Sequence, residues 1–78
     1  MKEQDRNPQE LVLTYYILES QEVARVSSDP ILGDDLGGEI LVGDRYWEDY
    51  PVSAIIGEGE LISRSEAKKC AKKLGLRL

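Results

Sequence analysis

A run of aliphatic and aromatic residues from Leu11 to Leu18, interrupted only by Thr14, constrains the fold more than any other segment. Residue types of this kind suit the pleated surface of a strand. Apolar side chains occupy both alternating sets of positions, so both faces of the strand need to be covered. We therefore expect a central strand here. The run is also far shorter than the roughly 20 residues that cross a bilayer.

The segments that follow this run predict further antiparallel strands. Residues 22–27 continue the extended pattern after a tight turn at Ser20 and Gln21, the alternative being one long bent strand. Residues 28–38 contain one proline, three glycines and three aspartates, which predicts a loop with several turns. Residues 39–43 and 51–57 are then expected to form a second antiparallel pair, joined by an aromatic and acidic turn.

The last element is predicted as a helix over residues 64–74. Ser63 and Glu66 have the spacing of a capping box, in which each side chain bonds the backbone amide of the other residue. A buried stripe is supplied at helical spacing by Ala67, Cys70, Ala71 and Leu74. Gly75 is placed to end the helix in a left-handed conformation.

These elements predict an α+β fold, a small antiparallel sheet of about four strands with one C-terminal helix packed on one face. A chain of 78 residues fits one domain, which we place at residues 10–78 after a flexible polar arm at residues 1–9. A single cysteine excludes an intramolecular disulfide, and the acidic start does not resemble a signal peptide. We therefore expect a cytoplasmic protein that does not contact membranes.

Charge is distributed unevenly along the chain. The net charge is −5, but residues 1–62 carry 4 basic and 14 acidic side chains while residues 63–78 carry 6 basic and 1 acidic. Such asymmetry can steer the approach of a charged partner.

Catalysis is not expected from this composition. The chain has no histidine, which removes the commonest general base and the commonest transition-metal ligand. Asp29, Asp34, Asp35 and Glu39 could offer oxygen ligands to Ca²⁺ or Mg²⁺, but their spacing departs from that of an EF-hand loop. We predict no catalytic residues, no cofactor and no metal site.

A segment rich in aromatic and acidic residues, 46–50, is the most distinctive candidate for binding. Tyrosine and tryptophan are enriched at protein interfaces. The leading hypothesis is a non-enzymatic interaction or regulatory module that binds a basic partner protein, in one version by imitating nucleic-acid phosphates. The proposed contact residues are Asp34, Asp35, Tyr46, Trp47, Glu48, Asp49 and Tyr50.

The alternative hypothesis is nucleic-acid binding through the basic face of the C-terminal helix. Its residues are Arg64, Lys68, Lys69, Lys72 and Lys73. The negative net charge and the lack of a second basic segment in the sequence make a nucleic-acid partner the less favoured of the two. A second copy of the chain is a further candidate partner, because the apolar first strand could pair through its edge or its open face.

Overall fold

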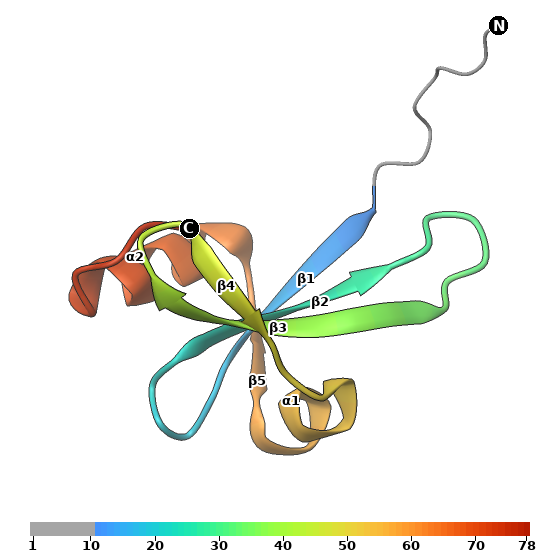
Figure 1. Cartoon of the computed structure of the whole chain (residues 1–78), viewed down its shortest axis with the longest axis horizontal. Coiled ribbons are helices and arrows are strands. Elements are labelled where there is room, and N and C mark those ends of the chain that lie inside the picture. The colour runs from blue at the N-terminus through green and yellow to red at the C-terminus, as the bar shows by residue number, and fades with distance from the viewer. Residues whose placement is uncertain (1–10) are drawn as a thin grey trace, which may run out of the picture.

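A five-stranded antiparallel sheet with a helix on each face forms the fold (Figure 1). The computed structural model describes residues 11–78, so the predicted arm at residues 1–9 lies outside the described part. The elements are β1 (Val12–Ile17), β2 (Val23–Ser28), β3 (Asp35–Gly43), β4 (Tyr46–Asp49), α1 (Val52–Glu58), β5 (Glu60–Ile62) and α2 (Arg64–Lys73). The strand order is β4-β3-β2-β1-β5. The α+β class is thus confirmed. Within residues 11–78, no helix is long and apolar enough to cross a membrane.

The two strands predicted first lie at the centre of the sheet. β1 pairs with β2 on one side and with β5 on the other, and β2 lies between β1 and β3. The turn at Ser20 and Gln21 is a hairpin, closed by a bond from the Gln21 amide to the Leu18 carbonyl of 2.8 Å. Both faces of β2 are buried, since Val23 and Ala24 are adjacent and fully enclosed. The central position expected for residues 11–18 is confirmed, because β1 is paired on both sides. The expected burial of both its faces holds only for its second half, since Leu11, Val12 and Leu13 are exposed.

The C-terminal helix covers one face of the sheet. Its capping box is present, with bonds of 3.1 Å in both directions between Ser63 and Glu66. Ala67 and Ala71 are fully buried against Tyr15, Val23 and Leu41. Of the other two residues of the predicted stripe, Cys70 is half-buried and Leu74 is exposed, so the stripe was predicted wrongly at its last position. The helix ends at Lys73, one residue before the predicted end, and Gly75 then takes a left-handed φ of 77° as expected.

The prediction that residues 39–43 pair with residues 51–57 is wrong. Residues 51–57 do not form a strand: α1 occupies Val52–Glu58, and the strand that pairs with β3 is β4, in the segment expected to be a turn. β3 also begins at Asp35, inside the predicted loop. The apolar residues Val52, Ile55 and Ile56 suit a helix as well as a strand. The helix forms because it buries Ile55 on the second face of the sheet.

α1 covers this second face and packs close to the backbone of β3. Ile55 is fully buried among Leu18, Ala24, Val26 and Ile40 on the face opposite α2. The approach depends on Gly38, where a Cβ atom would lie 2.6 Å from both Ile55 Cδ1 and the Tyr50 carbonyl oxygen.

This contact predicts different outcomes for two neighbouring glycines. We expect Gly38→Ala to lower the free energy of unfolding by about 1–3 kcal/mol, because the added methyl group must displace backbone or a packed side chain. Gly37→Ala should change it by less than about 0.5 kcal/mol, since the space around its Cβ position is open. Urea unfolding of both variants measures the difference. Equal effects would contradict the proposed packing of α1.

Candidate functional site

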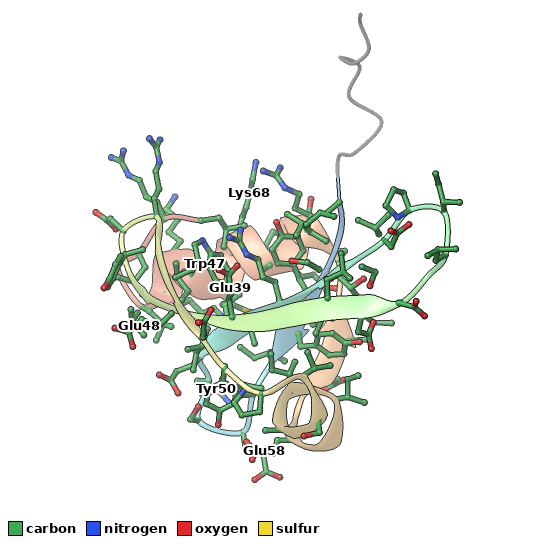
Figure 2. The ribbon with its side chains drawn as sticks, turned by 45° about the vertical axis from the view of Figure 1, so that its right-hand side comes forward. Glu39, Trp47, Glu48, Tyr50, Glu58 and Lys68 are labelled. Atoms are coloured by element: carbon green, nitrogen blue, oxygen red, sulfur yellow. The ribbon has the colours of Figure 1, made fainter. Side chains whose placement is uncertain are left out.

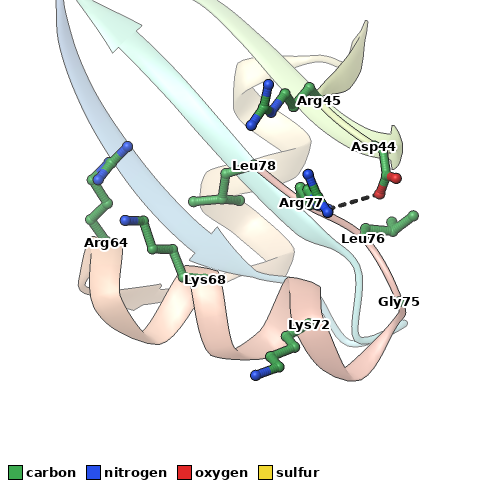
Figure 3. Close-up of a pocket in the computed structure, with 9 residues that line it drawn as sticks. All are labelled: Asp44, Arg45, Arg64, Lys68, Lys72, Gly75, Leu76, Arg77 and Leu78. Atoms are coloured by element: carbon green, nitrogen blue, oxygen red, sulfur yellow. Dashed lines mark hydrogen bonds between the residues drawn. The ribbon is translucent and has the colours of Figure 1, made fainter.

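Three cations of α2 line one side of an open hollow of about 720 Å³ between the helix and the β3–β4 turn (Figure 3). Arg64, Lys68 and Lys72 are spaced by four residues, so they follow one face of the helix. Lys69 and Lys73, which were predicted with them, do not line this hollow. The structure therefore divides the predicted basic set into three residues that line a concave surface and two that do not. Figure 3 shows the Lys72 side chain pointing away from Arg45 and Arg77.

Two arginines from other parts of the chain also line the hollow. Arg45 belongs to the β3–β4 turn and Arg77 to the segment that follows α2. The Arg45 amide donates to the Arg77 carbonyl at 2.8 Å, and the Arg77 amide donates to Asp44 Oδ1 at 3.1 Å. These bonds attach the end of the chain to the turn. They bring a second basic segment to the helix, which the sequence alone did not indicate. We call this site the basic cleft.

The charges of the basic cleft are not balanced by nearby acids. The side chains that line it include five cations and a single carboxylate, that of Asp44, which accepts a hydrogen bond from a backbone amide. Within residues 11–78 the one ion pair joins Arg25 and Glu39, which are on a different part of the sheet. Leu76 and Leu78 lie between the cations and pack against the core below. The cleft therefore offers a concentrated positive charge on a fixed support.

Arg45 has an unusual backbone conformation. Its φ is 54°, in the left-handed region that glycine adopts readily and that costs other residues roughly 1–2 kcal/mol. The position is the second residue of a tight turn, next to a register shift in β3. Gln21, in the β1–β2 turn, also has a left-handed φ, of 76°, so this conformation does not set Arg45 apart from other turn residues.

The aromatic residues of the leading hypothesis are separated by the alternation of β4 (Figure 2). Trp47 lies on the α2 face, half-buried against the core, with the Arg25 guanidinium 3.9 Å from its ring centroid. Arg25 Nε in turn bonds Glu39 Oε1 at 2.8 Å. Tyr50 packs in the cluster around α1. Of the three aromatic side chains only Tyr46 is exposed.

The acidic residues of that hypothesis are likewise spread over the surface. Glu48 and Asp49 project from opposite faces of the sheet, because they are adjacent in β4. Asp34 and Asp35 lie at the start of β3, four or more residues before Glu39, the partner of Asp49. At about 3.3 Å per residue, this separates the two groups by about 13 Å or more.

The loop before β3 is held by an aspartate that was considered as a metal ligand. Asp29 Oδ1 accepts hydrogen bonds from the amides of Leu32 and Ile31, and both bonds lower the pKa of this carboxyl below its ordinary value. The Asp29 carboxylate is therefore engaged by its own loop. Within residues 11–78, no three acidic or cysteine side chains gather closely enough to hold a metal ion.

Comparison of the chain with protein-family models, with curated proteins and with solved structures finds no match.

The strain at Arg45 predicts an effect on stability. We expect Arg45→Gly to leave the free energy of unfolding unchanged or to raise it by up to ~1 kcal/mol, because glycine accepts the left-handed conformation and keeps the amide bond to Arg77. Asp44→Ala should lower it by about 1 kcal/mol through loss of the bond to the Arg77 amide. Urea unfolding measures both. A marked destabilisation by Arg45→Gly would show that the arginine side chain serves the fold.

Proposed function

We propose that this protein is a non-enzymatic binding module that holds the sugar-phosphate backbone of a nucleic-acid strand in the basic cleft. The observation that carries the proposal is the meeting of Arg45 and Arg77 with Arg64, Lys68 and Lys72 around one hollow. The sequence presents a single basic helix, whereas the fold adds a second basic segment beside it. This changes the order of the two hypotheses that the sequence left open.

The arrangement of the cations suits a chain of phosphates better than a single small anion. Successive residues along Arg64, Lys68 and Lys72 are separated by four helical positions, about 6 Å along the axis. A row of this kind can neutralise several neighbouring phosphates. Arginine adds bidentate hydrogen bonds to phosphate oxygens, which lysine does not make.

The lining of the cleft favours contact with the backbone over the reading of bases. No aromatic side chain lines the hollow, so there is no platform on which bases could stack. Phosphate contacts position a nucleic acid and carry little sequence information. We therefore expect weak discrimination between sequences.

The remaining surface limits how a nucleic acid can approach. Residues 1–62 carry a net charge of −10, so much of the surface outside the basic cleft repels a polyanion. Affinity should depend strongly on salt. If all five cations contact phosphates, the logarithm of the association constant should fall with the logarithm of salt concentration at a slope no steeper than about −3.5 for single strands.

Two double variants of α2 test the proposal with the same change in charge. Lys68→Glu with Lys72→Glu should weaken binding of a fluorescent single-stranded oligonucleotide at low salt by roughly tenfold or more, since two phosphate contacts become repulsive. Lys69→Glu with Lys73→Glu, on the side of the helix away from the hollow, should have a much smaller effect. Fluorescence anisotropy measures the affinities, and circular dichroism checks that both variants keep their helices.

Equal losses in the two double variants would mean that only the total charge matters, and that the cleft is not the site. Absence of binding by the unmodified protein at low salt, to single strands and duplexes alike, would exclude the proposed function.

A basic partner protein is the second candidate, and one observation favours it. Tyr46 and Glu48 share a face of β4, a strand at the edge of the sheet, and both are exposed. If this surface binds a partner, Tyr46→Ala with Glu48→Lys should abolish capture of a basic protein from the native lysate. Leu61→Ala with Glu60→Lys, at the opposite edge, makes the same change in charge and should leave capture unchanged. If both variants capture the partner equally, the surface formed by Tyr46 and Glu48 is not the binding site.

A further inference from the structure

One end of the sheet projects beyond both helices (Figure 1). It consists of residues 12–14 of β1, residues 27–28 of β2 and residues 35–37 of β3, together with the loop that joins β2 to β3. We call it the projecting end. β5 pairs only with Tyr15–Ile17 of β1, and the ladder between β3 and β4 begins at Glu39. The projecting end is therefore covered neither by a helix nor by an outer strand.

Exposed aliphatic side chains are concentrated on this end. Six of the eleven large hydrophobic side chains that are exposed within residues 11–78 belong to it or border it, namely Leu11, Val12, Leu13, Ile31, Leu32 and Leu36. Single exposed aliphatic residues are normal on a protein surface, but a group on one face marks an interaction site. Leu11 and Leu13 form such a group on the α2 side of β1, whereas Val12 between them points to the opposite face.

The loop at the tip holds two of these side chains in a defined position. Ile31 is 82% exposed and Leu32 73%, yet the backbone amides of both bond Asp29 Oδ1, at 2.8 and 2.9 Å. The loop is closed by further bonds from Gly33 to the Asp29 carbonyl and from the Asp29 amide to the Asp34 carbonyl. A surface that is ordered before binding loses less entropy when it binds.

Two hollows on the α2 side of the sheet lie beside Leu11 and Leu13. One, of about 380 Å³, extends over Ser27 and Gly37, where nothing lies within 4 Å of the Cβ position of the glycine. The other, of about 390 Å³, extends over Ile62 to Arg64. The face therefore has protruding leucines next to two hollows, the first of which is also lined by the charged residues Arg25, Glu39 and Asp49.

We propose that the projecting ends of two copies of this chain pack face to face and form a symmetric dimer. Leu11 and Leu13 of each copy pack against the same surface of the other, and the β2–β3 loop of each copy extends toward the first turn of the other copy's α2. The proposed two-fold axis lies between the two facing sheets and runs perpendicular to their strands. It places one projecting end over the other and leaves the two α2 helices at opposite ends of the dimer.

Charge complementarity supports a second copy as the occupant. Asp34 and Asp35 follow the apolar tip of the loop, and Arg64 lines the hollow that the loop of the other copy would approach. The two-fold axis makes each of these contacts twice. The same aspartates disfavour an anionic membrane surface as the occupant.

The first test compares two exposed aliphatic positions. Sedimentation velocity over micromolar to millimolar concentrations, without nucleic acid, should show a dimer for the unmodified protein. Leu13→Glu should raise the dissociation constant at least tenfold, because it places charge in the apolar contact between the two sheets. Ile56→Glu, at an exposed position of α1 outside the projecting end, should leave it unchanged.

The second test exchanges charges across the interface. Asp34→Arg with Asp35→Arg should weaken the dimer, as should Arg64→Glu alone, and the combination of all three changes should restore much of the lost affinity. A failure of this restoration would overturn the proposed orientation.

A monomer at every concentration overturns the dimer itself. If the unmodified protein but not Leu13→Glu then binds neutral phosphatidylcholine vesicles, the projecting end contacts lipid instead. Neither result affects the proposed function of the basic cleft, which is measured separately with oligonucleotides.

Discussion

The whole structure depends on a sheet that has to be covered on both faces. In β2 the adjacent residues Val23 and Ala24 point to opposite faces, and neither is accessible to solvent. The cover comes from two short helices, seven residues in α1 and ten in α2. Because a chain of this length has few residues left to form layers, the cover is incomplete, and the uncovered end of the sheet is the surface on which we propose that a second copy packs.

The same constraint determines where the positive charge of the protein lies. α2 buries its alanines against the sheet, so its lysines and arginine surround the buried stripe. After Gly75 the chain turns back and is attached to the β3–β4 turn by the two hydrogen bonds that involve Arg77. Packing that stabilises the core thus places cations from three segments around one cleft. The acidic residues, in contrast, are distributed over loops and both sheet faces.

The parts of the fold that local interactions determine could be predicted from the sequence, whereas the parts that distant contacts determine could not. The capping box, the alanine stripe and Gly75 defined α2 to within one residue. Residues 51–57 carry apolar spacing that suits either a helix or a strand. What favours the helix is the contact of Ile55 with the space above Gly38, which is distant in sequence. For the same reason, only the residues that α2 contributes to the basic cleft could be predicted. Arg64, Lys68 and Lys72 share a helix, while Arg45 joins them through a bond to a residue 32 positions later.

The central claim is that the basic cleft binds phosphates through both of its sides. Two-dimensional ¹H–¹⁵N NMR during titration with a short single-stranded oligonucleotide tests it most directly. The account predicts shifts of the backbone amides of Arg45 and Arg77 together with those of Arg64, Lys68 and Lys72, and small changes at Tyr46 and Glu48. Shifts spread evenly over α2, with Lys69 and Lys73 as strongly affected and Arg45 unmoved, would contradict it.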